Sequence, residues 1–206
     1  MTIEITPDQF LAEARALSIS NEELVDELNW PYSAEVTNDP DPAAPVRSLT
    51  ISWEDPLAGL PQRKRMSGRE YLELIQRGEV AQPPIALLMD IDLVEVGEGR
   101  ATFEGHPAEQ HYNPIGVVHG GYVATLLDSA MGCAVETLQS AGTGYTTLEL
   151  KVNFTRPLTT ETGRVLAEGV VVHAGSRVAT AEGRLFSAET GKLLAHGTST
   201  LLVLGS

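Results

Sequence analysis

Five residues in one short stretch have the types and spacing that acid–base chemistry on a carbonyl group would need. The stretch NPIGVVHGGYVATLLD, residues 113 to 128, contains Asn113, His119, Gly120, Gly121 and Asp128. Glycines that open a helix leave backbone N–H groups that no helical carbonyl accepts. Such groups, with the partial positive charge of a helix start, suit a developing oxyanion. A side-chain amide and a carboxylate nearby complete an arrangement of donors and base that needs no Ser or Cys nucleophile.

The carboxylate falls on the shoulder of a predicted amphipathic helix over residues 120 to about 139. The apolar stripe of this helix should lie on a sheet. It consists of Val123, Leu127, Ala130, Met131, Ala134 and Leu138. The neighbours of Asp128 beside this stripe are nearly all small: Gly121, Ala124, Gly132 and Val135. Small neighbours leave room for a ligand or a second backbone, so we interpret Asp128 as functional and not as a solvated side chain. His119 is at the N-cap position, where fixing the loop and contacting substrate are both open roles.

The remaining patterns between residues 67 and 204 predict the elements that must position these groups. SGREYLELIQRGEV, residues 67–80, predicts a short helix capped by Ser67 and ending near Gly78. Residues 91–107 predict two strands joined at the turn of Gly97 and Gly99. Four segments of period two follow the long helix, at 145–155, 162–173, 177–188 and 192–204, and predict a four-strand meander. The order predicts an α+β fold in which an antiparallel sheet is covered by the long helix.

The first part of the chain differs in composition. Residues 1–60 contain twelve Asp/Glu and two Lys/Arg, a net charge of −10, out of −14 for the whole chain. We therefore expect an acidic, proline-rich N-terminal extension over residues 1–65 and one domain over residues 66–206. Within the extension, residues 6–28 predict one or two short helices, and residues 46–53 (VRSLTISW) alternate enough to predict an added strand. No chemistry is assigned to it.

The totals exclude several kinds of partner. A net charge of −14 argues against nucleic acid or an anionic membrane surface. The lone cysteine, Cys133, permits no intramolecular disulfide, and the acidic start lacks the features of a signal peptide, so a cytoplasmic protein is expected. Cys133 is interpreted as a packing residue. The spacing of His106, His111 and His119 matches no metal-ligand pattern, so no metal site is expected.

Three stretches together resemble a known family: NPIGVVHGGYVATLLDSAMGCAV, TTLELKVNFTRPL and VVHAGSRVATAEGRL. With the spacing Asn–x5–His–Gly–Gly–x6–Asp, they resemble the hotdog-fold acyl-CoA thioesterases of the PaaI (phenylacetic-acid-degradation) type. The resemblance covers residues 84–204. It implies a hotdog fold, a long helix wrapped by an antiparallel sheet, and an obligate dimer or dimer of dimers in which each site is shared between two subunits.

The resemblance also implies roles for particular residues. The N–H of Gly120 would polarise the thioester carbonyl with help from Asn113, and Asp128 would act as general base on water or as nucleophile. The substrate would be held by His119, Gly121 and a threonine hydroxyl that places the water, with both Thr146 and Thr147 as candidates. Coenzyme A would be held by Arg156, Pro157, His173, Gly175, Ser176 and Arg177. No cofactor is implied beyond the coenzyme A of the substrate, and the N-terminal extension inherits no role.

Two other functions stay open beside hydrolysis of aryl- or short- to medium-chain acyl-CoA. A hotdog enoyl-CoA hydratase-like enzyme would need His111 or His119 to work with a carboxylate. A non-catalytic acyl-CoA-binding module would have no use for Asp128, which argues against it. The sequence does not indicate which acyl group is preferred.

Overall fold

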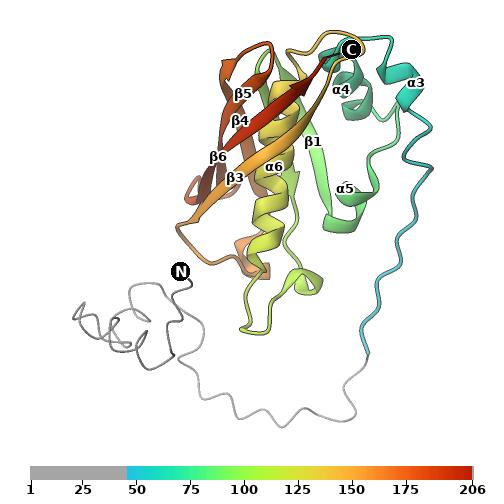
Figure 1. The fold of residues 1–206 in the computed structure, drawn as a ribbon. Helices are drawn as coiled ribbons and strands as arrows, with labels where there is room; N and C mark the ends of the chain where they lie inside the picture. Colours follow the sequence, from blue (N-terminus) through green and yellow to red (C-terminus); the bar gives the residue numbers. More distant parts are fainter. Residues whose placement is uncertain (1–45, 206) are drawn as a thin grey trace, which may run out of the picture. The chain divides into compact units, whose positions relative to one another are not determined.

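The computed structural model describes residues 46–205, in which an antiparallel sheet of six strands curves around one long helix (Figure 1). The strand order is β1-β2-β4-β5-β6-β3. The strands are β1 (Ile91–Gly97), β2 (Arg100–Gly105), β3 (Gly144–Phe154), β4 (Val165–Ala174), β5 (Val178–Ser187) and β6 (Leu193–Leu204). The predicted α+β fold with an antiparallel sheet is confirmed.

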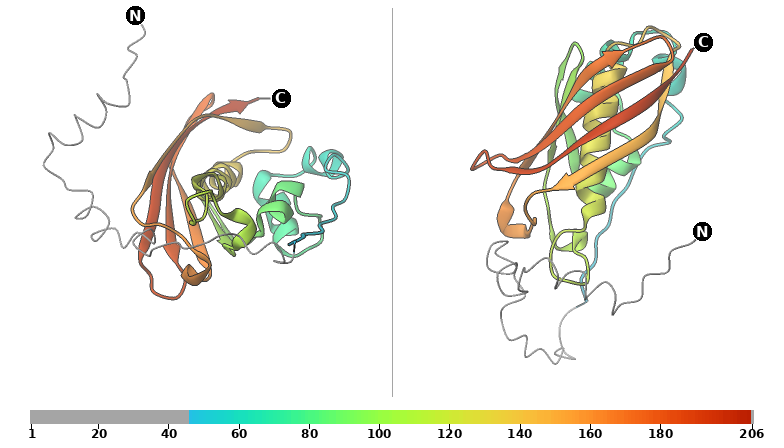
Figure 2. Two further views of the ribbon diagram at one scale, coloured as in Figure 1. Left: turned by 90° about the horizontal axis from the view of Figure 1, so that it is seen from below. Right: turned by 60° about the vertical axis from the view of Figure 1, so that its left-hand side comes forward.

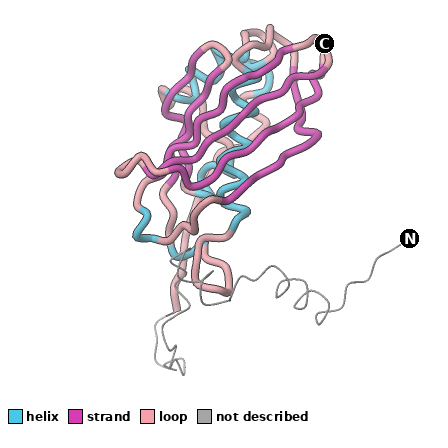
Figure 3. The backbone as a smooth tube through the Cα atoms, turned by 90° about the vertical axis from the view of Figure 1, so that its left-hand side faces the viewer, coloured by secondary structure: helices cyan, strands magenta, loops and turns pink. Residues whose placement is uncertain are grey.

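The predicted four-strand meander is wrong for its first strand. Strands β4, β5 and β6 follow one another in the sheet, but β3 pairs with β6 at the far edge and not with β4. The chain therefore crosses from one side of the meander to the other between β3 and β4, through the short 3-10 turn Thr160–Thr162. The face-on view in Figure 3 shows these strands running across the molecule. Period-two alternation locates each strand but carries no information about its partner.

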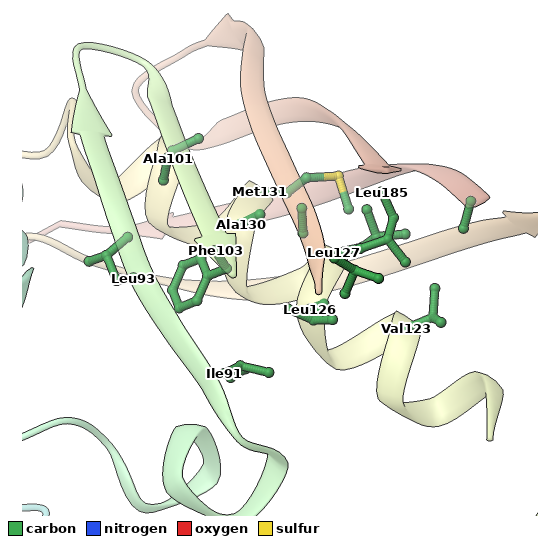
Figure 4. Packing of buried hydrophobic residues seen from close by; sticks show 14 of the residues in the cluster. Ile91, Leu93, Ala101, Phe103, Val123, Leu126, Leu127, Ala130, Met131 and Leu185 are labelled. Carbon is green, nitrogen blue, oxygen red and sulfur yellow. The ribbon is translucent and has the colours of Figure 1, made fainter. Parts of the chain in front are cut away.

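The long helix α6 (Gly120–Glu136) lies in the concave side of the sheet, as the left view of Figure 2 shows. The predicted apolar stripe is buried except for Leu138, which lies beyond the end of the helix and is exposed. Leu126 is also fully buried, which widens the stripe beyond the prediction. Figure 4 shows this helix face packed among side chains of β1, β2 and β5.

Two glycines in a row of three let α6 approach the sheet closely. Gly169, Gly183 and Gly197 are direct partners across β4, β5 and β6. A Cβ atom at Gly169 would lie 2.2 Å from the backbone oxygen of Ala130 in α6, and one at Gly183 would lie 3.1 Å from Leu127 Cδ2. The glycine row thus sets the distance between helix and sheet.

Within residues 46–90, three short helices precede the sheet: α3 (Leu60–Arg63), α4 (Gly68–Gln76) and α5 (Pro84–Met89). Helix α4 begins in a capping box of Ser67 and Glu70 and is followed by Gly78 at φ +71°, as predicted. Helices α4 and α5 contact β1. The strand predicted over residues 46–53 is wrong, because these residues form no strand and are largely exposed.

Residues from Arg47 onward belong to one compact unit. The helices predicted over residues 6–28, and most of the predicted extension, lie outside the described residues. The boundary at residues 65 and 66 stays a prediction. Within the described part of the chain, none of the helices combines the length and apolar character needed to cross a membrane.

Candidate active site

The start of α6 leaves one backbone donor free. His119 is the N-cap residue, and its Nδ1 accepts a hydrogen bond of 2.8 Å from the N–H of Gly121. The expected capping role of His119 is therefore present, and the N–H of Gly121 is already used. The N–H of Gly120 has no acceptor within residues 46–205. A Cβ atom at Gly120 would lie 3.1 Å from Phe154 Cζ, so this helix start lies beside the end of β3.

The loop before the helix holds Asn113 in a fixed orientation. Its Oδ1 accepts hydrogen bonds from the N–H groups of Ile115 (3.0 Å) and Val117 (3.3 Å), and Gly116 turns the chain at φ +82°. Because the side-chain oxygen is used within the loop, the Nδ2 group points away from it. This group has no acceptor among residues 46–205 and is a second free donor.

Asp128 is paired with a hydroxyl on the neighbouring strand. Thr147 Oγ1 donates a hydrogen bond of 2.9 Å to Asp128 Oδ1, and both side chains are half-buried. Thr146 is exposed, because adjacent residues of a strand point to opposite faces. Of the two threonines predicted from the sequence, the structure brings Thr147 to the carboxylate.

The donors and the carboxylate do not converge within one chain. Gly120 and Asp128 are eight residues apart on α6, which corresponds to about 12 Å along the helix axis. A donor must lie about 3 Å from the oxyanion that it stabilises, and the base must reach water at the same carbonyl. One thioester group therefore cannot contact Gly120 and Asp128 of the same chain.

The residues expected to bind coenzyme A also fall into two separate groups. Arg156 and Pro157 follow the Phe154 end of β3, where Phe154 pairs with Ala195, and Arg156 Nη1 donates to the Leu193 carbonyl at 2.6 Å. The second group forms the β4–β5 turn: His173, Gly175, Ser176 and Arg177. The carbonyl of Arg177 accepts from the N–H of Val203, the β6 residue that pairs with Tyr145 at the other end of β3. The stretch of β6 from residue 195 to residue 203 separates the two groups by about 27 Å.

Tyr145 is a residue of this site that the sequence analysis missed. It precedes Thr147 by two positions on the same face of β3, and its hydroxyl lies over Gly132, one helical turn after Asp128. A Cβ at Gly132 would be 2.7 Å from that hydroxyl. Burial raises the pKa of Tyr145 well above its ordinary value. The available signal was Gly132 itself, a glycine in mid-helix beside the carboxylate.

Cys133 and His111 offer no reactive group to the proposed carboxylate chemistry. Burial raises the pKa of the Cys133 thiol to about 12, so it has almost no thiolate at neutral pH. His111 is buried and stacked on Tyr122, with ring centroids 4.4 Å apart, and burial lowers its pKa. This position inside the core does not favour a hydratase that would use His111 as its base. Among residues 46–205, no group of three His, Cys, Asp or Glu side chains is arranged to hold a metal ion.

Comparison with known proteins bears on the family of this chain. The model of the thioesterase superfamily matches residues 115–194. A protein of Saccharolobus solfataricus, provisionally named as an esterase, is 32% identical over 116 residues, which are 56% of this chain and 80% of that protein. Human acyl-coenzyme A thioesterase 13 is 29% identical over 119 residues, which are 55% of this chain and 80% of the human protein.

A solved structure extends the agreement to the fold. A variant of the phenylacetic acid degradation protein PaaI from Thermus thermophilus superposes with a TM-score of 0.52 at 29% identity, covering 58% of this chain and 97% of that protein. The chain belongs to the thioesterase superfamily and has the hotdog fold. Within that superfamily it is a thioester hydrolase, as the resemblance to PaaI-type thioesterases predicted.

Proposed function

We propose that the protein hydrolyses acyl-CoA thioesters to a free acid and coenzyme A. The observation that carries this proposal is the hydrogen bond from Thr147 to Asp128, in a chain that also holds free donors at Gly120 and Asn113. The naming of the human relative as an acyl-coenzyme A thioesterase supports coenzyme A as the leaving group. The reaction needs only groups of the chain itself and water, so no further cofactor is proposed.

The active unit is a dimer formed along β3. This strand has eleven residues and is an outer strand of the sheet, with Leu148 and Phe154 exposed at 58% and 56%. Unpaired strand edges of this kind are templates for pairing with another chain. A second copy, paired antiparallel about a two-fold axis near the middle of β3, would extend the sheet across both subunits. A dimer of dimers stays compatible with this arrangement.

Antiparallel pairing of β3 with its copy would bring the donors of one subunit to the carboxylate of the other. Along β3, Phe154 lies beside Gly120 and Thr147 lies beside Asp128. Reversing the second strand brings the partner subunit's Phe154, and with it the partner's Gly120, next to Thr147 and Asp128. The same operation brings Arg156 of the partner subunit to the end of β3 where the β4–β5 turn lies. One two-fold axis would therefore bring together the residues that are far apart within one chain, both at the carbonyl site and at the coenzyme A site.

The proposed chemistry is general-base hydrolysis. Asp128 takes a proton from a water molecule that the Thr147 hydroxyl helps to place, and the water oxygen attacks the thioester carbon. The Gly120 N–H and Asn113 Nδ2 of the other subunit stabilise the resulting oxyanion. When the tetrahedral intermediate collapses, the carbon–sulfur bond breaks and the coenzyme A thiolate recovers the proton from Asp128.

Release of coenzyme A, measured with a thiol reagent on a panel of acyl-CoA esters, tests the proposed activity directly. Hydration of an unsaturated acyl-CoA, or binding alone, would release no thiol, so a protein that is active in those ways and releases none would contradict the proposal. Single-turnover hydrolysis in ¹⁸O-labelled water separates the two roles of Asp128. A general base sends the label to the acid product, whereas a nucleophilic carboxylate retains it in the protein after the first turnover.

A further inference from the structure

Both free donors belong to one hairpin of the chain. Residues 111–119, here called the donor hairpin, contain Asn113, and Gly120 follows them directly. An antiparallel bridge and a hydrogen bond of 2.8 Å from the Asn113 N–H join the two sides of the hairpin. At its base, the His111 carbonyl accepts a hydrogen bond of 2.7 Å from the N–H of His119. The base is therefore the last closed pair before Gly120, and it sets where the two donors lie relative to each other.

The side chain of His111 connects this base to the rest of the domain. Its Nδ1 accepts a hydrogen bond of 3.0 Å from the N–H of Ala108, which lies between β2 and the donor hairpin. Its ring stacks on Tyr122 of α6, with the ring centroids 4.4 Å apart and an angle of 29° between the ring planes. Tyr122 comes two residues after Gly120 and is 2% exposed. His111 thus links the chain before the hairpin, the base of the hairpin and the first turn of α6.

The other polar side chains of the donor hairpin make different contacts. Asn113 Oδ1 accepts from N–H groups inside the hairpin, and His119 Nδ1 accepts from the first turn of α6. The Tyr112 hydroxyl accepts a hydrogen bond of 2.9 Å from the N–H of Thr160, which ties the hairpin to the crossover between β3 and β4. The His111 ring fixes the hairpin against a buried side chain of α6, the helix whose first N–H is the other donor.

His111 presents no polar atom to a substrate. The residue is 8% exposed, its Nδ1 is used by Ala108, and its Nε2 is shielded from solvent. A neutral imidazole has one donor nitrogen and one acceptor nitrogen, so acceptance at Nδ1 places the proton on Nε2. His111 therefore does not serve the reaction as an acid or a base, and any effect that it has on turnover must pass through the groups that it holds.

We propose that His111 is a positioning residue for the oxyanion donors. Its two side-chain contacts hold the donor hairpin where Asn113 Nδ2 and the Gly120 N–H reach the same oxygen. This inference rests on the proposed acyl-CoA hydrolysis, in which those two groups stabilise the oxyanion. Donors of this kind must lie about 3 Å from that oxygen, so a small displacement of the hairpin weakens hydrogen bonds that form in the transition state.

The test measures kcat and KM by thiol release in the full chain, with circular dichroism to confirm folding. His111→Phe keeps a ring that can stack on Tyr122 but removes the acceptor for Ala108. Loss of one whole oxyanion donor lowers kcat by about a hundredfold to a thousandfold, so displacement of the hairpin should lower kcat by at least about tenfold, with KM within about twofold. His196→Phe makes the same change at an exposed position of β6 and, as the matched control, should alter neither.

Further variants separate positioning from stability. His111→Asn has a side-chain oxygen near the place of Nδ1 and can still accept from Ala108, so it should restore kcat to within about threefold of wild type. Leu93→Ala removes buried apolar atoms from β1 and should lower the free energy of unfolding while kcat stays within about twofold. If His111→Phe fails to fold, Tyr122→Leu removes the other stacked ring and should show the same loss of kcat at an unchanged KM.

The outcomes distinguish this inference from the proposed function. A wild-type protein that releases no thiol from any acyl-CoA ester contradicts hydrolysis itself, and the positioning role falls with it. In an active protein, a near-normal kcat in folded His111→Phe, or in Tyr122→Leu where that variant replaces it, overturns the positioning role alone. A raised KM at unchanged kcat overturns it too. If His111→Asn is no faster than His111→Phe, or if Leu93→Ala loses as much kcat, His111 acts through stability and the inference is wrong.

Discussion

The two edge strands of the sheet, β1 and β3, differ in how their outer edges are covered. Strand β1 contacts α4 and α5, and the side chain of Gln76 donates a hydrogen bond of 2.6 Å to the Val94 carbonyl in the middle of β1. A register shift between Leu93 and Glu95 further breaks the regularity of this strand. Strand β3 has eleven residues, exposes Leu148, and has no strand on its outer side among residues 46–205.

The contrast indicates where the protein is complete and where it needs a second copy. Proteins protect strand edges by covering or distorting them, and this chain does both at β1. Strand β3 also has a register shift, between Thr147 and Glu149, but the helices α4 and α5 contact β1. Strand β3 is also the strand that carries Thr147. Its uncovered edge and the incomplete active site coincide, which is what a catalytic dimer interface requires.

The largest expected effect belongs to the carboxylate at the β3 side. Asp128→Asn keeps the shape but removes the base, so kcat should fall by at least about a hundredfold with the fold intact. Asp92→Asn makes the same change on β1, where Asp92 accepts only from Gln82, and should alter kcat by less than about twofold. Thiol-release kinetics and circular dichroism measure both variants. A folded Asp128→Asn protein with near-normal turnover contradicts the role of Asp128.

The helices that cover β1 can be destabilised at Arg63, which pairs with Glu136 of α6. Arg63→Ala leaves Glu136 buried without its cation and should cost about 3 kcal/mol of unfolding free energy, against less than about 0.5 for Arg69→Ala, which breaks an exposed pair with Glu73. Burial already raises the pKa of Glu136, with Arg63 opposing that shift.

The sign of the pH dependence follows from that raised pKa. A raised pKa means that the folded state prefers the protonated acid, so the deficit of Arg63→Ala should grow as pH rises above the ordinary Glu value and shrink as pH falls. Urea unfolding of both proteins at pH 5 and pH 8 measures this loss of unfolding free energy. A loss that does not change with pH would show that Arg63 acts through packing alone.

The edges themselves can be compared with one pair of variants. Leu148→Lys places a charge on the β3 edge that the proposed dimer buries, and should lower dimer affinity and reduce activity by about tenfold at nanomolar protein concentration. Val94→Lys puts the same charge on β1, where Val94 is also exposed, and should leave both unchanged. Light scattering and activity across a dilution series decide. Equal effects from the two variants would remove the distinction between the edges.

Mixing inactive subunits tests whether the site is shared across β3. Asn113→Ala and Asp128→Asn, each inactive alone, should regain activity when co-expressed, because one site of a mixed dimer contains both changes and the other contains neither. Random assortment makes about a quarter of all sites wild type. Native mass spectrometry must first confirm mixed dimers. With those present, an inactive mixture rules out a shared site.

The smallest expected effect is that of removing residues 1–45. Every element of the hotdog pattern lies within residues 46–205, so the truncated protein should keep its kcat and its dimeric state within about twofold. If the truncated protein aggregates or changes its acyl preference, residues 1–45 are part of the functional domain.

The long helix could be predicted from the sequence because its buried stripe and its capped start are local patterns. Asp128 followed from the motif and the two candidate threonines from the family resemblance, and the structure places Thr147 in hydrogen-bond contact with Asp128. The partner of β3 could not be predicted, since pairing depends on a crossover that no local pattern encodes. Residues 46–53 alternate but form no strand, because alternation does not show that a partner strand exists. Tyr145 could not be predicted, because its position over Gly132 depends on the packing of β3 on α6.

The glycine row has a further consequence for the evolution of this enzyme. The height of α6 above the sheet, and with it the reach from Thr147 to Asp128, depends on Gly169 and Gly183, two positions where no side chain exists. Variation at either position shifts helix and carboxylate together, so a gain in substrate range there would carry a loss in turnover. Laboratory libraries aimed at new acyl groups should therefore leave both glycines unchanged.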